Sequence, residues 1–147
     1  MKPLLEVSDV CLSYHSISGE TRVLSHISFS LFPGEFLAVV GPSGCGKSTL
    51  LNLICGLLKP EQGQILLNGE PVFAGDCRIG YMLQKDHLLE WRKIYKNVIL
   101  GLEIRKELTA EKLAYVNQML LTYGLDKFRN AYPSQLSGGM RQRAALI

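Results

Sequence analysis

Gly41-Pro42-Ser43-Gly44-Cys45-Gly46-Lys47-Ser48 is the stretch that decides how the rest of this sequence is interpreted. It fits the spacing Gly-x-x-x-x-Gly-Lys-Ser/Thr, in which the backbone N–H groups of a glycine-rich loop turn inward around phosphate oxygens. Before it, residues 36–40 form an apolar run that is typical of a strand buried on both faces of a parallel sheet. After it, residues 47–55 have the pattern of a helix that ends at Gly56. Strand, glycine loop and helix therefore occur in the order that a phosphate-binding loop requires.

Each part of this loop has a physical role in holding a polyphosphate. Its glycines allow the backbone to curl, and the start of the following helix adds partial positive charge. We expect Lys47 to reach the β- and γ-phosphates, Ser48 to offer its hydroxyl to Mg²⁺ and Thr49 to support the α-phosphate. The alternative is a glycine-rich turn with no ligand, which the flanking strand and helix disfavour. The predicted nucleotide-binding residues of the loop are Gly41, Pro42, Ser43, Gly44, Cys45, Gly46, Lys47, Ser48 and Thr49.

Length and composition exclude several classes of protein. The 147 residues are 47% hydrophobic and 20% charged, which fits one globular domain and argues against disorder. The 16 Lys and Arg residues exceed the 13 Asp and Glu residues only slightly and are scattered, so nucleic-acid binding is not indicated. No apolar stretch approaches the roughly 20 residues that cross a bilayer. Because the start carries an early acidic residue and no signal-peptide core, we expect a cytoplasmic location.

Cysteine and histidine spacing favours no metal site. The four cysteines form no Cys-x-x-Cys pair and have no histidine partners at zinc spacing, so each is expected to be a small buried apolar residue. They are Cys11, Cys45, Cys55 and Cys77. The histidines are isolated in sequence and are expected at the surface or in hydrogen bonds. They are His15, His26 and His87.

Outside the loop, the first half of the chain reads mainly as strands. Residues 4–10 and 23–31 are rich in β-branched and apolar residues, which predicts two strands. Residues 64–68 and 79–83 predict two shorter strands. The turn residues expected between them are Asn68-Gly69 and Gly75-Asp76.

The second half of the chain reads as helical. Residues 86–132 place Leu113, Val116 and Leu120 at helical spacing, and Thr109 stands where an N-cap residue would. A further helix is expected to begin near Met140 and to continue to Ile147. Residues 86–132 therefore predict a mainly helical subdomain.

A second glycine-bearing stretch, Leu136-Ser137-Gly138-Gly139-Met140-Arg141-Gln142-Arg143, precedes that last helix. Ser137 is expected to cap the helix, and two glycines allow close backbone approach to an anion at its positive end. Such a stretch is more often a plain loop and cap, but the phosphate-binding loop earlier in the chain favours a second phosphate contact. The stretch resembles the Leu-Ser-Gly-Gly-Gln signature motif of ATP-binding cassette (ABC) ATPases, with Met140 in place of glutamine.

Two further positions match the same family. Tyr14 matches the aromatic residue that stacks on adenine, although an ordinary core or surface tyrosine is the alternative. Gln84 matches the Q-loop glutamine, whose amide oxygen reaches Mg²⁺ or its water, and a surface glutamine is the alternative. The resemblance therefore implies ATP and Mg²⁺ as cofactors, with Ser48 and Gln84 at the metal.

The resemblance covers Leu4 to Ile147 and implies an α/β fold. This is the P-loop NTPase fold, with a RecA-like core, an antiparallel β layer and a helical subdomain. We expect residues 1–85 to form the β layer and core, residues 86–135 the helical subdomain, and residues 136–147 the signature and the start of its helix. The chain is accordingly expected to be a partial, C-terminally incomplete nucleotide-binding domain.

Family resemblance also implies partners. A head-to-tail dimer is expected, in which Ser137, Gly138, Gly139 and Met140 contact the nucleotide held by the other subunit. Residues 84–92, with Asn97-Val98 and Gly101-Leu102-Glu103, are similar to the nitrate, sulfonate and taurine importer group, although Glu90 stands where that group usually has proline. This implies a peripheral protein at the inner face of the membrane, coupled to a permease and indirectly to a solute-binding protein. The segment from Gln84 to Trp91 is expected to receive a permease helix.

Family members also carry an apolar strand that ends in Asp and is followed by a catalytic Glu, beyond the signature. No four apolar residues followed by Asp or Glu occur between the phosphate-binding loop and Ile147. We therefore expect slow hydrolysis by this chain alone, because general base catalysis is typically worth about 10²–10⁴-fold.

Three functions stay open at this stage. The first is an importer ATPase subunit, and the second is a truncated, non-catalytic remnant that binds nucleotide weakly. The third is a DNA-repair or chromosome-organising cassette ATPase. Residues 86–132 disfavour the third, because they hold ordinary helix lengths where those proteins insert long coiled coils.

Overall fold

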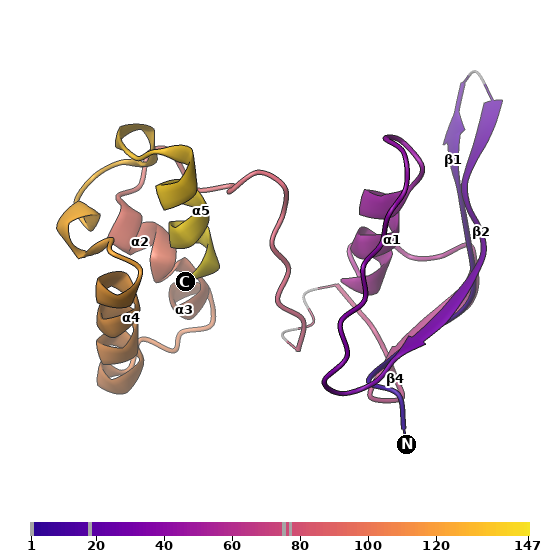
Figure 1. Ribbon diagram of the computed structural model, residues 1–147, viewed down its shortest axis with the longest axis horizontal. Coiled ribbons are helices and arrows are strands. Elements are labelled where there is room, and N and C mark those ends of the chain that lie inside the picture. Colours follow the sequence, from indigo (N-terminus) through magenta and orange to yellow (C-terminus); the bar gives the residue numbers. More distant parts are fainter. Residues whose placement is uncertain (1, 18, 75, 77) are drawn as a thin grey trace. The chain divides into compact units, whose positions relative to one another are not determined.

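The computed structural model describes residues 2–17, 19–74, 76 and 78–147, and it divides into two compact units, Met1–Gly80 and Tyr81–Ile147 (Figure 1). Length and composition, by contrast, favour one domain. Gly75 of a predicted turn and Cys77 lie outside the described residues.

The first unit is built on a four-stranded antiparallel sheet in the order β2-β1-β3-β4. The strands are β1 (Leu5–Ser16), β2 (Gly19–Leu31), β3 (Gln62–Leu67) and β4 (Glu70–Pro71). Leu5 on the central strand β1 lies opposite Leu31 on one side and Leu67 on the other. The two predicted N-terminal strands are confirmed, and both are longer than the predicted ranges.

A tight hairpin joins β3 to β4. Asn68 and Gly69 have φ angles of 55° and 84°, the left-handed pair that a two-residue primed turn requires, so the predicted turn is confirmed. The predicted strand at 79–83 is wrong, because Glu70 and Pro71 take the pairing positions opposite Leu67 and Leu66. No described strand pairs with residues 79–83.

The predicted helix after the glycine loop is α1 (Lys47–Ile54). Its buried residues Leu50 and Leu53 pack into one core with apolar side chains of the sheet. The other buried members of that core are Leu5, Val7, Val10, Leu12, Leu24, Ile65 and Leu67. This packing fixes α1, and with it the end of the glycine loop, relative to β1.

The predicted buried strand at residues 36–40 is wrong. This run has no regular secondary structure, and Phe36 and Val40 are 93% and 89% exposed. A parallel strand exists only where neighbouring strands satisfy its backbone groups and cover its faces. No strand of the described residues pairs with this run, so its apolar composition alone does not make it a strand.

The second unit is helical, which confirms the sequence prediction. Its elements are α2 (Ile94–Val98), α3 (Leu100–Ile104), α4 (Ala110–Thr122), the 3₁₀ helices η1 (Asp126–Phe128) and η2 (Pro133–Gln135), and α5 (Gly138–Leu146). Thr109 caps α4 by accepting a hydrogen bond from the Lys112 N–H at 3.3 Å, as predicted. A separate core gathers Ile94, Ile99, Val116, Leu120, Leu125, Leu136 and Ala144.

The cysteine predictions are correct only in part. Cys11 is buried as predicted, but Cys45 is exposed and Cys55 is half-buried. Cys45 lies in the glycine loop, where its Sγ is 3.6 Å from the Lys47 ammonium nitrogen. Partial burial raises the pKa of the Cys55 thiol.

The histidines lie where the sequence predicts. His15 Nε2 lies 2.9 Å from Glu61 Oε1, and His26 Nδ1 lies 2.7 Å from Asp9 Oδ1, while His87 is exposed. Among the described residues, no group of three or more His, Cys, Asp and Glu side chains is placed to hold a metal ion. Within the same part of the chain, every helix is too short or too polar to cross a membrane.

Candidate functional site

The shape of the glycine loop depends on two left-handed glycines. Gly44 and Gly46 have φ angles of 81° and 95°, a region that residues with a Cβ atom rarely occupy. Gly46 is the N-cap residue of α1 and accepts the first helical hydrogen bond from the Leu50 N–H at 2.8 Å. The last glycine of the loop is therefore also the first capping residue of α1.

Lys47 folds back across the loop. Its ammonium group donates hydrogen bonds to the carbonyl oxygens of Gly41 at 2.8 Å and Pro42 at 2.6 Å. The same nitrogen lies 3.6 Å from Cys45 Sγ. These contacts hold one positive charge within the curl of the loop, where a polyphosphate tail would bring negative charge.

The start of α1 adds a second source of positive potential. Its first turn contains no acidic residue, and its N-cap residue, Gly46, provides no side-chain hydrogen bond to the helix. The partial positive charge of the helix N-terminus therefore meets no carboxylate from its own first turn. Ser48 is exposed in that turn, and Thr49 follows it.

Tyr14 lies beside this helix. Its hydroxyl is 3.3 Å from Thr49 Oγ1, and 48% of the residue is exposed. The structure thus brings Tyr14, predicted only from family resemblance, to the first turn of α1. An exposed aromatic ring next to a phosphate-binding loop can cover a nucleoside base.

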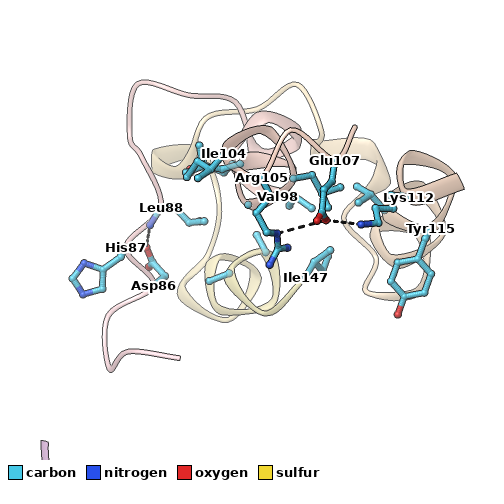
Figure 2. A pocket seen from close by; sticks show the side chains of 17 residues that line it. Asp86, His87, Leu88, Val98, Ile104, Arg105, Glu107, Lys112, Tyr115 and Ile147 are labelled. Atoms are coloured by element: carbon cyan, nitrogen blue, oxygen red, sulfur yellow. Dashed lines mark hydrogen bonds and ion pairs between the residues drawn. The ribbon is translucent and has the colours of Figure 1, made fainter. Parts of the chain in front are cut away.

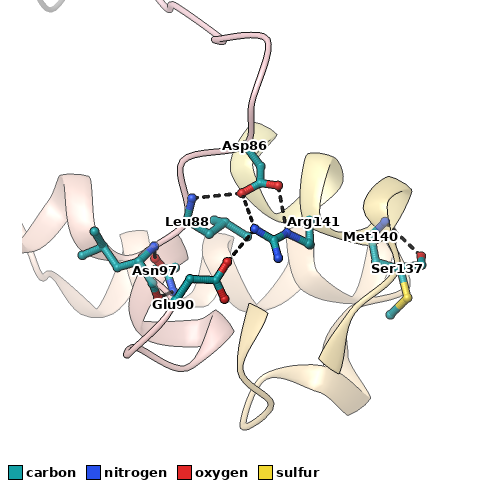
Figure 3. Close-up of polar contacts among 8 residues, drawn as sticks. Asp86, Leu88, Glu90, Asn97, Ser137, Met140 and Arg141 are labelled. Carbon is teal, nitrogen blue, oxygen red and sulfur yellow. Dashed lines mark hydrogen bonds and ion pairs between the residues drawn. The ribbon is translucent and has the colours of Figure 1, made fainter. Parts of the chain in front are cut away.

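The second unit brings Gln84 close to the start of α5. A cavity of about 370 Å³ is lined by Gln84, Lys85, Asp86, His87, Leu88, Gly138, Arg141 and Gln142. Ser137 caps α5 by accepting a hydrogen bond from the Met140 N–H at 3.4 Å, as predicted (Figure 3). A Cβ atom on Gly138 or Gly139 would meet nothing within 4 Å, so the backbone there is open to a ligand. The predicted residues therefore divide between the units, with the loop and Tyr14 in one and Gln84 and the signature in the other.

An ion-pair cluster joins the Gln84 segment to α5, and sequence reasoning missed it. Arg141 Nε donates to Asp86 Oδ2 at 2.8 Å, and Arg141 Nη2 donates to Asp86 Oδ1 at 3.1 Å and to Glu90 Oε1 at 2.7 Å (Figure 3). The hydrogen bonds from Arg141 lower the pKa of Asp86 and favour its ionised form. The two elements are 55 residues apart in sequence, so no local spacing could have paired them.

Asn97 fixes the backbone of the same segment. Its buried side chain accepts a hydrogen bond from the Leu89 N–H at 2.7 Å and donates to the carbonyl oxygens of Leu89 at 3.1 Å and Arg92 at 2.9 Å. One amide therefore supplies hydrogen-bond partners to backbone groups of a segment without regular secondary structure.

A larger cavity of about 630 Å³ opens in the second unit (Figure 2). Apolar residues such as Leu88, Val98 and Ile104 line it. At its rim, Glu107 lies between two cations, 2.5 Å from Lys112 Nζ and 3.7 Å from Arg105 Nε. The arrangement is an apolar hollow with a charged border.

Comparisons with known proteins agree on one family. A family profile described as ABC transporter matches residues 24–147. The uncharacterized ABC transporter ATP-binding protein YtlC of Bacillus subtilis is 45% identical over 97% of this chain and 55% of its own length. The taurine import ATP-binding protein TauB of Pseudomonas aeruginosa is 39% identical over 97% of this chain and 54% of its own length. The aliphatic sulfonates import ATP-binding protein SsuB of Bacillus cereus is 34% identical over 97% of this chain and 55% of its own length. The chain thus spans about half the length of the curated relatives it matches.

Solved structures show the same fold. The ATP-binding cassette MJ0796, a dimer in a post-hydrolysis state bound to ADP and Pi, aligns with a TM-score of 0.82 and 29% identity. That alignment covers 97% of this chain and 67% of MJ0796. CbiO1 from Clostridium perfringens, part of the ABC transporter complex cbiONQ, aligns with a TM-score of 0.76 and 27% identity over 99% of this chain and 60% of cbiO1.

Proposed function

Because this chain belongs to the ABC transporter family of ATP-binding proteins, we propose that it couples ATP binding and hydrolysis to solute import through a membrane permease. The predicted family and its α/β P-loop NTPase fold are confirmed by the family profile and by the solved cassettes. One observation carries the proposal. Lys47 lies across a loop of left-handed glycines at the start of α1, with Tyr14 beside it.

The proposed nucleotide site comprises residues 41–49 with Tyr14. The loop amides and Lys47 would hold the phosphates, and the Tyr14 ring would stack on the base. Gln84 of the second unit is proposed to act at the same nucleotide, as the family resemblance implies.

Mg²⁺ fits the donor groups that the chain offers. This ion prefers oxygen ligands and completes its shell with phosphate oxygens and water, so a hydroxyl and an amide oxygen are suitable donors. Ser48 is exposed in the first turn of α1, and Gln84 is exposed in the second unit. We propose these two residues as the protein ligands. When bound, the ion would neutralise phosphate charge.

The signature residues 137–140 are proposed to contact the nucleotide of a second subunit. Ser137 and the two glycines after it begin α5, where the helix end favours an anion and the backbone is open. The similar cassette MJ0796 is a dimer bound to ADP and Pi, which supports a head-to-tail partner.

We propose a nitrate, sulfonate or taurine type of importer, since TauB and SsuB are among the relatives. The permease would contact the segment from Gln84 to Trp91, with the protein peripheral at the cytoplasmic side of the membrane. Trp91 is 75% exposed, and Leu88 lines the larger apolar cavity. Single cysteines at Leu88, Leu89 and Trp91 should crosslink to cytoplasmic loops of the permease. Failure of all three would remove this docking surface from the proposal.

The second candidate is a non-catalytic product that binds nucleotide weakly, and the exposed apolar run at residues 36–40 favours it. We propose that residues 1–147 alone hydrolyse ATP slowly, because no four consecutive apolar residues followed by Asp or Glu occur between the loop and Ile147. Phosphate release by the purified chain measures this. A rate equal to that of a complete importer ATPase would contradict it.

Solute uptake by membrane vesicles that hold the assembled importer tests the proposed function. ATP-driven uptake of taurine or an alkanesulfonate should disappear in Lys47→Ala and persist in Lys59→Ala, which removes an exposed lysine beyond α1. Uptake that survives Lys47→Ala would contradict the proposal.

A further inference from the structure

Strand β1 continues beyond the end of its neighbour β3. The last residue pair between them is Cys11 with Gln62, whereas β1 runs on to Ser16. Past that point, β2 is the one strand of the described residues that pairs with β1, with Tyr14 opposite Thr21. A two-stranded ribbon is only marginally stable by itself, so the end of β1 that carries Tyr14 needs another support.

Glu61 supplies that support from the residue just before β3. Its backbone N–H donates to the Cys11 carbonyl at 3.0 Å, and its Oε2 accepts from the Ser13 N–H at 3.0 Å. The carboxylate thus takes the place of the next strand residue and extends the hydrogen-bond ladder along β1.

The same carboxylate also holds the residue on the other side of Tyr14. Glu61 Oε1 lies 2.9 Å from His15 Nε2, and this contact lowers the pKa of Glu61, so the group is ionised at neutral pH. Glu61 therefore contacts both sequence neighbours of Tyr14. The tyrosine hydroxyl meets Thr49 Oγ1 at 3.3 Å, which fixes the other end of the side chain against the helix that follows the phosphate loop.

We propose that Glu61 is a positioning residue that holds Tyr14 where it stacks on the base of a bound nucleotide. The inference rests on the proposed ATP site and deepens it. It assigns the base contact to the Tyr14 ring and the position of that ring to the Glu61 carboxylate. Through Tyr14, Glu61 affects binding of the base, whereas the glycine loop binds the phosphates. Removing it should therefore weaken ligands that carry a base and spare ligands that do not.

Equilibrium binding of ATP and of inorganic tripolyphosphate to the purified protein separates the two effects. Stacking of a base on an aromatic side chain is worth about 5- to 150-fold in affinity, so Tyr14→Ala should lower the ratio of ATP to tripolyphosphate affinity within that range. Glu61→Ala should lower the same ratio by about three- to tenfold, a part of the full stacking effect, with tripolyphosphate affinity unchanged. In a Tyr14→Ala background, Glu61→Ala should have no further effect on the ratio.

Two variants serve as controls. Glu20→Ala removes the same charge from the facing position on β2, opposite His15, and should leave the ratio at the wild-type value. Glu61→Gln keeps an oxygen that can accept the Ser13 N–H and should recover most of the ratio. If Glu61→Ala does not fold, as shown by lost tripolyphosphate binding, His15→Ala carries the test with an expected decrease of about twofold.

The inference would be overturned if Tyr14→Ala lowered the ratio of ATP to tripolyphosphate affinity while Glu61→Ala kept the wild-type ratio. That result would leave the proposed ATP site intact. An unchanged ratio in Tyr14→Ala would also overturn it, because there would be no stacking to position. Failure of wild-type protein to bind either ligand would instead contradict the proposed function itself.

Discussion

Gly46, the N-cap residue of α1, is the position where the backbone between the glycine loop and the helix tolerates a side chain least. Its φ of 95° disfavours any side chain, and a Cβ atom would lie 3.0 Å from both Val23 Cγ1 and Leu24 Cδ2. Gly44 has a similar φ of 81° but open space around it. Backbone strain and crowding therefore act together at Gly46, whereas strain acts alone at Gly44.

Substitution by alanine separates these two costs. Gly44→Ala should lower the free energy of unfolding by about 1–2 kcal/mol, the usual cost of a left-handed residue with a Cβ atom. Gly46→Ala should lower it by about 2–4 kcal/mol, because overpacking adds to the strain. Urea unfolding followed by circular dichroism measures both. Equal losses would show that the neighbours of Gly46 move aside at no cost.

Asp86 provides a test by pH. Arg141 lowers the pKa of Asp86 in the folded protein, so the ion pair stabilises the fold fully above the ordinary aspartate pKa of about 3.9. That stabilisation is lost as the pH falls through the lower, folded-state value. The free energy of unfolding should therefore fall less steeply below about pH 4 in Asp86→Asn than in wild-type protein. Glu111→Gln, which removes an exposed carboxyl group from α4, is the control, and identical acid profiles for Asp86→Asn and wild type would contradict the assignment.

At the scale of elements, the segment from Asp86 to Arg92 is irregular yet firmly held. Asn97 of α2 forms hydrogen bonds with its backbone, and Arg141 of α5 binds its carboxylates (Figure 3). Hydrogen bonds and ion pairs thus connect the segment proposed to contact a permease with α5, the helix proposed to contact a nucleotide. Both ties lie within the second unit.

Truncating Asn97 should loosen this segment. Asn97→Ala removes the side-chain partner of the Leu89 N–H and of the Arg92 carbonyl oxygen, which costs about 1–3 kcal/mol of unfolding free energy. Hydrogen exchange at the Leu89 amide should accelerate. Gln118→Ala on the exposed face of α4 should change neither quantity. Unchanged exchange at Leu89 in Asn97→Ala would show that the amide is not what holds the loop.

The sequence predicted helices better than strands, and the physical reason is local. Thr109 and Ser137 cap α4 and α5 as expected, because a helix satisfies most of its hydrogen bonds within itself. Residues 36–40 and 79–83 were expected to be strands, but a strand needs a partner that no local pattern specifies. The motif located the glycine loop, and family resemblance singled out Tyr14, which lies beside α1, while nucleotide binding by both stays a prediction. The contacts of Arg141 and Glu61 could not be predicted, because each joins residues 46 or more positions apart.

For the whole molecule, the two units carry different parts of one proposed task. The first unit holds the loop and Tyr14, and the second holds Gln84 and the signature. The family match spans both units, from residue 24 to residue 147. We therefore expect nucleotide binding to depend first on the first unit, and its use for transport to depend on both.

Calorimetric titration of the purified protein with ATP in the presence of Mg²⁺ tests the central claim that residues 41–49 hold a polyphosphate. Wild type should bind ATP saturably and more weakly when Mg²⁺ is removed. Lys47→Ala should lose at least about tenfold in affinity, since it removes a charge-assisted contact of about 1.5–3 kcal/mol. Lys59→Ala should bind like wild type. Saturable binding of equal affinity in Lys47→Ala and wild type would contradict the account.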